Sequence, residues 1–292
     1  RTLRTRQNLR VLQRLAAQGD VTTATALERM LDGAGLSAEL LLDETVARCR
    51  AAGTVEHDGS EVDVGAAAEV LAGWDGKSDL DAVGAALWRE VTGAFSVNQL
   101  CDGPELWATP FDPDDPVQTP SGLADPPASG ADPIVAAVAR AVVALDAAGV
   151  ALDAVLGDVQ WVQRGEHRVG VPGGGDSEGL LNVMTPVGPL SSSTLEPQSA
   201  LGAAVPGHTE RTGLRHGGYR CTYGTSFVMS VELTDDGPQG IGFLAYGQSG
   251  DPDSEHHVDG TRMFAGGETR PLLFADADIE ADPNLVRRTV RS

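Results

Sequence analysis

Ser249 and the two histidines that follow it come nearest to a catalytic or metal-binding arrangement by residue type and spacing. They lie in LAYGQSGDPDSEHHVDG, residues 244–260. A nucleophile elbow requires the pattern Gly-x-Ser-x-Gly, because the second glycine lets the following helix approach the strained turn. Here Asp251 takes the place of that glycine and no helix is predicted to follow. We therefore interpret Ser249 as a structural residue.

His256 and His257 stand among acidic residues, which raises the alternative of a metal site. Adjacent histidines point to opposite faces of a strand, and in a loop they seldom converge on one ion. The acids at 251, 253, 255 and 259 also lack the glycine that a calcium loop carries at its sixth position. A solvated acidic loop is the favoured interpretation, and a metal hydrolase that uses both histidines is the competing hypothesis.

Two further segments have chemical potential. VPGGGDSEG, residues 171–179, resembles a phosphate-binding loop, but it matches neither GxGxxG nor GxxxxGK[ST] and a strand-like run follows it. Asp176 and Ser177 in that segment could contact a polar ligand, although a turn between strands is favoured. HTERTGLRHGGYR, from His208 to Arg220, is a basic patch that either receives a substrate carboxylate or pairs with the acidic surface.

The charge balance of the chain excludes some classes of partner. Its 292 residues carry 42 acids and 21 bases, for a formal net charge of -21. Nucleic acids and anionic membranes require a positive surface, so neither is expected as a partner. The three cysteines form no CxxC pair, and no window is long and apolar enough to span a membrane. Arg1 in the first position suggests a processed precursor or a part of a longer chain.

Helices are predicted over most of the first half. Leu9, Val11, Leu12 and Leu15 have helical spacing and predict one apolar stripe. Thr22 or Thr23 is expected to cap a second helix that ends near Gly33, and Ser37 a third. EVDVGAAAEVLAGWDG and DLDAVGAALWREV predict two more, and Asp132 followed by Pro133 predicts the start of another.

The region 101–131 interrupts the helical pattern with seven prolines. Trp107 and Phe111 within it favour a loop anchored to the body over a free linker. We expect one structural unit, with a helical portion over 1–158 and a β-rich portion over 159–292.

Strands are predicted after residue 158. VQWVQRGEHRVGV is typical of two strands around a turn at Gly165, and GLLNVMTPV of another. YRCTYGTSFVMSVELTDDGPQGIGFLAYG predicts two strands joined by an Asp-Asp-Gly-Pro turn, and the end of the chain predicts a short helix and a last strand. Helices first and antiparallel strands later define an α+β fold.

The order of several segments resembles the penicillin amidase (acylase) family. These segments are WDG at 74–76, LWATPFDPDDPVQTPSGL at 106–123, GVPGGGDSEGLLNVM at 170–184, YGTSFVMSVEL at 223–233 and LAYGQSGDPDSEHHVDGTRMFAGGETRPLLF at 244–274. The resemblance covers nearly the whole chain, and it is closest to acyl-homoserine-lactone and aculeacin acylases.

The resemblance implies an N-terminal nucleophile hydrolase with an αββα sandwich, of which this chain would be the carboxy-terminal part of the large subunit. In such enzymes the first residue of the large subunit is a serine, whose own α-amino group acts as the base. An α-amino group has an ordinary pKa of about 7.7 to 8.0, so a fair share of it is neutral at working pH. The resemblance places both the serine and the oxyanion-stabilising asparagine outside this segment.

Two arginines are the site residues that the resemblance suggests here. The family carries an arginine near the active site at the start of the corresponding helical region, and Arg4 and Arg6 are the candidates. A surface arginine at a helix start is the competing interpretation for each of them.

The expected function is therefore hydrolysis of an acyl amide by the complete protein, with the remainder of the acylase as partner. Candidate substrates are an acyl-homoserine lactone, a β-lactam or a lipopeptide. No cofactor is expected to take part in the chemistry, although the resemblance allows a structural calcium ion, and the expected location is periplasmic or extracellular. The alternative is a non-catalytic acidic α+β module that binds a partner through the Trp107 loop or the patch from His208 to Arg220.

Overall fold

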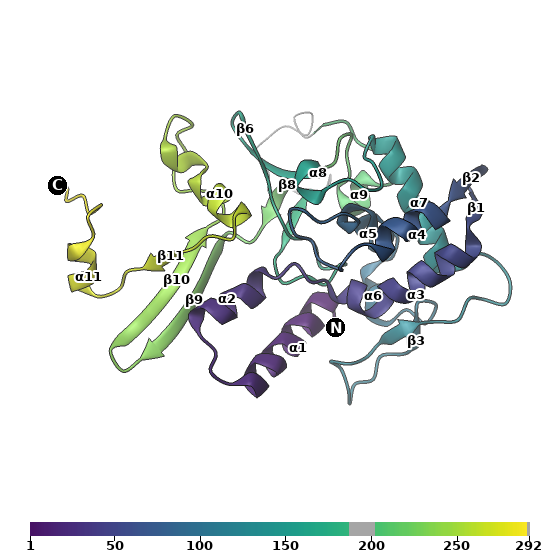
Figure 1. Cartoon of the computed structure of the whole chain (residues 1–292), viewed down its shortest axis with the longest axis horizontal. Coiled ribbons are helices and arrows are strands. Elements are labelled where there is room, and N and C mark those ends of the chain that lie inside the picture. The colour runs from purple at the N-terminus through teal and green to yellow at the C-terminus, as the bar shows by residue number, and fades with distance from the viewer. Residues whose placement is uncertain (187–201, 291–292) are drawn as a thin grey trace.

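The first half of the chain is mostly helical (Figure 1). The structure is a computed structural model that describes residues 1–186 and 202–290. Its helices up to residue 148 are α1 (Leu3–Gln18), α2 (Thr23–Leu31), α3 (Leu36–Ala52), α4 (Val64–Ala72), α5 (Ala85–Thr92), α6 (Val97–Asp102) and α7 (Pro133–Ala148). The hairpin of β1 (Thr54–His57) and β2 (Ser60–Asp63), which was not predicted, lies between α3 and α4.

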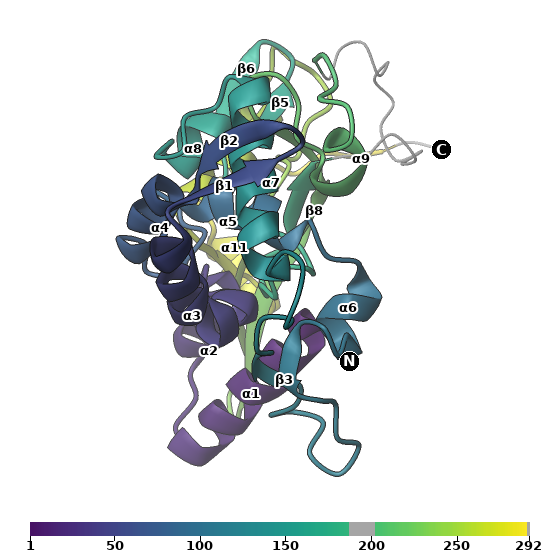
Figure 2. The ribbon, with the colours of Figure 1, turned by 90° about the vertical axis from the view of Figure 1, so that its right-hand side faces the viewer.

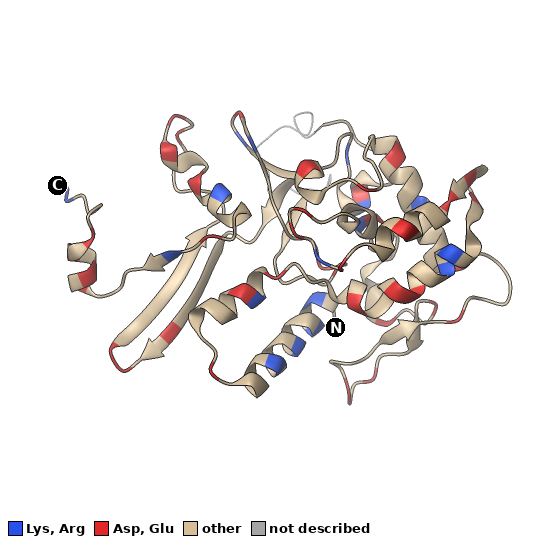
Figure 3. Ribbon diagram, in the orientation of Figure 1, with Lys and Arg blue, Asp and Glu red and all other residues tan. Residues whose placement is uncertain are grey.

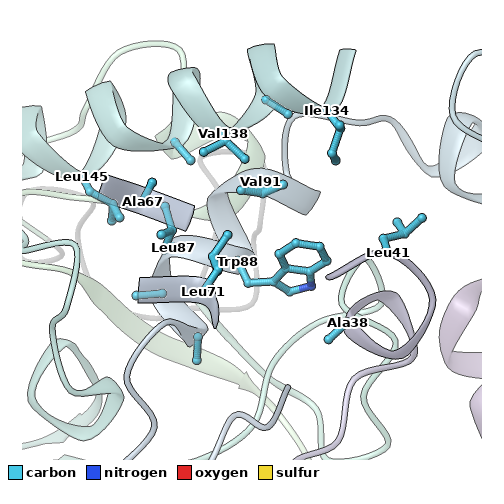
Figure 4. Packing of buried hydrophobic residues seen from close by; sticks show 14 of the residues in the cluster. Ala38, Leu41, Ala67, Leu71, Leu87, Trp88, Val91, Ile134, Val138 and Leu145 are labelled. Atoms are coloured by element: carbon cyan, nitrogen blue, oxygen red, sulfur yellow. The ribbon is translucent and has the colours of Figure 1, made fainter. Parts of the chain in front are cut away.

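The larger core forms where α7 packs against α3, α4 and α5 (Figure 2). Trp88 on α5 lies in the middle of this core (Figure 4). The centroid of its ring is 6.0 Å from that of Trp74. Several alanines on α4 and α7 are fully buried, and such small residues let helices approach closely. Each fully buried large side chain stabilises the fold by about 1.5–3 kcal/mol. This core holds α5 rigidly, and α5 carries the charged residues described below.

Local signals place two of the three predicted helix caps correctly, but the helices predicted from residues 61 and 79 begin only at Val64 and Ala85. Thr22 accepts a hydrogen bond from the Thr25 N–H, and Asp132 caps α7 with Pro133 at its first position, so both predicted caps are confirmed. The Ser37 cap is wrong, because Gly35 is the N-cap of α3. Ser37 lies inside the first turn, where its buried hydroxyl bonds to two distant partners.

The predicted apolar stripe of α1 is only partly buried. Leu12 is 53% exposed, and the buried residues are Leu3, Arg6, Gln7 and Val11. Two long polar side chains therefore face the interior on this helix, which the spacing of the leucines does not reveal.

The proline-rich segment folds back on the body. β3 (Trp107–Thr109) pairs with β4 (Ser121–Leu123), and Trp107 is buried with its indole N–H donating to the Gln99 carbonyl at 3.1 Å. The segment passes over the start of α1 and covers Arg6.

The strands form small sheets. One sheet has the order β6-β5-β8-β7, from β5 (Gln160–Arg164), β6 (His167–Gly170), β7 (Met184–Pro186) and β8 (Tyr219–Gly224). The hairpin of β5 and β6 around Gly165 is as predicted. Strands β5 and β8 pair in parallel, contrary to the expected antiparallel arrangement, and they lie about 60 residues apart in the sequence. The short helix α8 (Leu156–Val159) leads into β5, and α9 (Thr209–Thr212) precedes β8.

A second sheet has the order β11-β10-β9 and extends away from the helical body (Figure 1). Its strands are β9 (Phe227–Thr234), β10 (Gly237–Leu244) and β11 (Arg270–Leu272). One face packs on α2 and on α10 (Asp259–Ala265) through a smaller core that includes Val228, Phe243 and Phe264.

Three strand predictions need correction. The run from Tyr219 to Thr234 is not one strand, because residues 225–226 separate β8 from β9 and the two belong to different sheets. GLLNVMTPV supplies only the three residues of β7 before residues 187–201, which lie outside the described part. The end of the chain forms the predicted short helix, α11 (Asp276–Ala281), but residues 283–290 form no strand.

Candidate functional site

Arg6 is the one of the two candidate arginines that the fold buries. It points inward from α1, is fully buried, and its Nε donates to the Val117 carbonyl at 3.2 Å. The two terminal nitrogens, Nη1 and Nη2, are buried and have no hydrogen-bond partner among the described residues. Burial, and after it the nearby charge of Arg10, lower the pKa of Arg6 to about 10, so the guanidinium stays charged at neutral pH.

A buried cation with two free donor atoms is costly. Removing an ion from water costs several kcal/mol unless hydrogen bonds and an opposite charge compensate. Asp115 and Glu39 favour the charged form of Arg6 only through longer-range attraction. The terminal nitrogens of Arg6 therefore lack, among residues 1–186 and 202–290, the acceptors that would offset the cost of burial.

Arg4 lies two residues earlier on α1, about half a turn away, and in a different setting. Its side chain is half-exposed, and its Nε lies 3.9 Å from the Asp176 carboxylate, which is itself exposed. An exposed pair at this distance contributes little to stability. Arg4 thus contacts the outer side of the glycine-rich turn, whereas Arg6 faces the interior.

The glycine-rich turn binds a carboxylate of its own chain. Glu178 accepts a hydrogen bond from the Gly175 N–H at 2.6 Å. The Glu178 carbonyl accepts from both the Ser37 hydroxyl at 2.9 Å and the Ser37 N–H at 3.2 Å. This arrangement agrees with the predicted structural turn between neighbouring segments. It argues against a phosphate-binding loop, because the Glu178 carboxylate already accepts a backbone N–H of the turn.

Arg89 on α5 is the partner of Glu178 and the centre of a buried polar cluster. Its Nε lies 3.2 Å from Glu178 Oε1, and it also donates to the Gln160 side chain and to the Gly173 carbonyl. The guanidinium stacks over the Tyr219 ring, 4.7 Å from the centroid. Burial acts against the charge and is the largest single influence, but Glu178, with smaller contributions from Tyr219 and Cys221, outweighs it, and the pKa of Arg89 is raised.

Glu90, the next residue on α5, is the second acid of this cluster. It accepts a 2.6 Å hydrogen bond from the Tyr219 hydroxyl, and the His208 ring lies 3.9 Å away. Burial raises the pKa of Glu90, although the bonds from Tyr219 and Thr212 oppose the shift. Burial, followed by the charge of Arg140, lowers the pKa of His208.

Sequence reasoning missed this cluster. The signal was present in ALWREV, where Arg89 and Glu90 stand in a run of apolar residues. Charges inside an apolar stretch of helix become buried and must find partners. The partners come from distant segments, which spacing alone does not identify.

A cavity of about 550 Å³ lies over the outer side of the buried pair. The Gly175–Glu178 turn, the 93–100 segment and residues 211–213 line it. Arg211, at the rim, donates to the Ala94 carbonyl at 2.8 Å. The basic patch from His208 thus makes contacts with carbonyl oxygens and with Glu90, while His216 is exposed.

Ser249 and the histidines are not assembled for catalysis. The Ser249 hydroxyl accepts a hydrogen bond from the Asp251 N–H at 3.1 Å. His257 Nδ1 lies 3.1 Å from the Ser249 carbonyl oxygen, whereas His256 Nδ1 lies 2.9 Å from Asp259. A short 3₁₀ turn (Glu255–His257) and α10 follow Ser249, so the expectation of no helix after it is wrong in detail.

The described residues hold neither a metal-binding cluster nor a helix that could cross a membrane. Within residues 1–186 and 202–290, no group of three His, Cys, Asp or Glu side chains is placed to hold a metal ion. In the same residues, no helix has both the length and the apolar character that a membrane crossing requires.

A known protein family matches most of the chain. The profile described as penicillin amidase matches residues 1–281, and the chain belongs to this family. Its mixed helices and small sheets are consistent with part of an N-terminal nucleophile hydrolase, as the resemblance implied.

Individual relatives match along most of the chain. It is 33% identical over 292 residues to aculeacin-A acylase of Actinoplanes utahensis. The matched region covers 98% of this chain and 32% of that protein. It is 29% identical over 273 residues to the acyl-homoserine lactone acylase PvdQ of Pseudomonas putida. This matched region covers 93% of this chain and 30% of that protein. The chain therefore spans about a third of the length of these curated relatives.

Proposed function

We propose that the chain is the carboxy-terminal part of the large subunit of an acylase that removes an acyl group from an amide. The observation that carries this proposal is the family match over residues 1–281. Two of the similar proteins are named as acylases, which supports it further. The reactive serine and the oxyanion asparagine lie, on this proposal, in the part of the gene product outside these 292 residues.

The proposed reaction proceeds through an acyl-enzyme. The serine hydroxyl attacks the amide carbonyl, and the serine's own α-amino group accepts the proton and passes it to the leaving amine. Backbone N–H groups and an asparagine stabilise the tetrahedral oxyanion, and water then releases the acid. The described residues take no direct part in these steps, which require no metal or organic cofactor. A structural calcium ion belongs to the same proposal.

Arg6 is the residue through which this chain would act on the site. Its terminal nitrogens are buried and free of partners among the described residues, so they can donate to a carbonyl or carboxylate of the catalytic part. Such bonds would offset the cost of burying the charge and hold the catalytic segment in place. Arg4, which is half-exposed beside Asp176, lacks this capacity to act as an inward donor.

The substrate classes follow from the relatives alone. An acyl-homoserine lactone and an aculeacin-type lipopeptide correspond to the two names, and a penicillin to the family description. We also propose export to the periplasm or the outside of the cell, where such substrates are met.

The test is to express the complete precursor and offer it these three classes of acyl amide. Mass spectrometry should detect the free acid and the free amine from at least one class, and a large subunit whose first residue is serine. Activity should persist after dialysis against EDTA that leaves the fold intact. Failure to hydrolyse any of them, together with an unprocessed chain, would favour the acidic binding module.

A further inference from the structure

A second cavity lies among α3, α7 and the β1-β2 hairpin, which are neighbours at one end of the helical body (Figure 1). Its volume is about 400 Å³, within the range that small-molecule sites occupy. Its walls are mainly apolar and include Ala51, Ala52, Val55, Val135, Ala136 and Ala139. Because alanine side chains are short, the two helices and the hairpin leave this space unfilled. We call it the alanine cavity.

The positive groups beside the alanine cavity are already engaged. Arg48 lines it and is only 13% exposed. Its Nη1 donates to the Asp132 carboxylate at 3.3 Å, and its Nη2 donates to the Ala124 carbonyl at 2.7 Å and to Glu44. The Asp132 carboxylate also caps the first turn of α7, which is the positive end of that helix. Neither group is therefore available to bind an anion in the cavity.

The negative end of α3 is open to the alanine cavity. Ala51 and Ala52 are the last two residues of this helix, and both line the cavity. Within residues 1–186 and 202–290 no hydrogen bond is donated to either of their carbonyl oxygens. The carboxy-terminal end of a helix favours a positive charge. Arg50, the one base in the last turn of α3, is paired with Glu69 at 2.7 Å instead.

The β1-β2 hairpin adds further negative charge. Residues 54–63, TVEHDGSEVD, hold four acids and no lysine or arginine, and Figure 3 shows acidic positions along the hairpin. Glu56 lines the cavity and stands opposite Glu61 in register. The two-residue turn after His57 makes this a non-hydrogen-bonded pair, in which side chains are closest and the Glu56 carbonyl points away from β2.

Two acids in this position repel each other. Like charges directly opposite on neighbouring strands destabilise a hairpin. Among the residues that the structure describes, neither Glu56 nor Glu61 forms an ion pair, and the Glu56 carbonyl accepts no hydrogen bond. The mouth of the alanine cavity therefore offers acceptors and negative charge without a donor to match them.

We propose that the alanine cavity binds a hydrophobic ammonium ion, that is, a primary amine with a hydrocarbon body. The body would be buried against the alanines, and the three N–H donors would meet the Glu56 carbonyl and carboxylate and the end of α3. This inference goes beyond the proposed function and does not depend on it, because none of these residues takes part in the proposed reaction.

The test uses a light-activated label on the complete precursor. The protein is irradiated with an alkylamine that carries a diazirine, and the labelled peptides are identified by mass spectrometry. We expect labels within residues 48–57 and 126–139, which line the cavity. Phenylbutylamine should suppress this labelling at a concentration at least about tenfold lower than the uncharged phenylbutanol, because only the amine meets the negative groups.

A charge variant examines the acids of the hairpin. Glu56→Gln combined with Glu61→Gln removes both charges and should lower labelling of these peptides at least about fivefold. Asp43→Asn combined with Asp153→Asn is the matched control. It changes the net charge equally at two exposed positions that do not line the cavity, and it should leave the labelling unchanged.

A size variant examines the apolar walls. Ala136→Leu projects a larger side chain into the cavity from a half-buried position of α7, and leucine is a good helix former. Labelling should fall at least about tenfold, because the hydrocarbon body loses its space. Ala147→Leu, at an exposed position of the same helix away from the cavity, is the control and should be labelled like the parent.

Three results would each overturn the proposal. They are labels that fall outside the two cavity segments, phenylbutanol that competes as well as phenylbutylamine, and full labelling of the Ala136→Leu protein. The competition between amine and alcohol needs no substitution, so it decides the question even if a variant fails to fold. Because labelling does not require hydrolysis, a precursor without acylase activity would refute the proposed function and leave this test intact.

Discussion

Arg89 Nε lies 3.2 Å from Glu178 Oε1, and both side chains are only 4% exposed. The pair joins α5 to the glycine-rich turn, and Gln160 and Gly173 each accept a hydrogen bond from one terminal nitrogen of Arg89. A buried pair is costly to form, but it is far more costly to break from one side.

Glu178→Gln should therefore destabilise the protein severely. It removes the countercharge and leaves the guanidinium buried, which costs about 3–5 kcal/mol of unfolding free energy. Urea denaturation followed by circular dichroism measures this change. Glu69→Gln is the control, because it breaks the exposed Arg50–Glu69 pair, and it should leave the midpoint unchanged. An equal effect of the two substitutions would show that burial of the pair is unimportant.

Ser37→Ala should cost about 1–3 kcal/mol, because it leaves the buried indole N–H of Trp88 without an acceptor. The Ser37 hydroxyl accepts from Trp88 Nε1 at 2.8 Å and donates to the Glu178 carbonyl. Thermal unfolding of the variant measures the loss. Ser60→Ala, at an exposed position of β2, is the control and should stay within about 0.5 kcal/mol of the parent. A neutral Ser37→Ala would mean that water replaces the hydroxyl.

Ionisation of the Glu90 carboxyl group should lower the unfolding free energy of the protein as pH rises. Its folded pKa is raised above the ordinary value of 4.5, so the folded state binds more protons than the unfolded state above that pH. Stability from this group is full below pH 4.5 and falls as pH rises through the folded pKa. Glu90→Gln retains an acceptor for the Tyr219 hydroxyl and cannot ionise.

The Glu90→Gln variant should accordingly match the parent near pH 4 and exceed it in stability at pH 7. Denaturation midpoints measured at both values check the expectation. A parent that is the more stable of the two at pH 7 would show that the Glu90 anion is favoured by its surroundings, contrary to the direction of the pKa shift.

Substitution of Arg6 should lower the activity of the complete enzyme, whereas substitution of Arg4 should not. Arg6→Lys keeps the charge but loses the planar fork of donors, and we expect kcat to fall by about 100-fold with little change in KM, as for a misplaced catalytic group. Steady-state kinetics on the hydrolysed acyl amide give both constants. Arg4→Lys is the matched control and should retain the parental kcat. Equal losses would remove the distinction between the two arginines.

Ser249→Ala should leave kcat of the complete enzyme within about tenfold of the parent, whereas loss of a true nucleophile costs about a millionfold. The Ser249 hydroxyl bonds to the next turn of its own loop, and the neighbouring histidine contacts the Ser249 carbonyl instead. Complete loss of activity in a variant with an unchanged circular dichroism spectrum would assign the nucleophile to this residue.

The sequence predicted elements wherever the signal is local. The caps at Thr22 and Asp132 depend on a side chain and a backbone N–H two or three residues away, so residue type and order identify them. The family resemblance was carried in the same way, by short motifs in a fixed order. The Ser37 cap failed because that hydroxyl has partners 51 and 141 residues away, at Trp88 and Glu178.

The sequence by itself determined the acidic charge, the α+β composition and the hairpin at Gly165, since these follow from residue types and their local order. Arg4 and Arg6 became candidates only through the family resemblance. Only the tertiary structure decided that Arg6 is buried and Arg4 half-exposed, that Arg89 meets Glu178, and that one side of β9 stays open. These features depend on contacts between segments far apart in the chain, where packing and desolvation outweigh local preference.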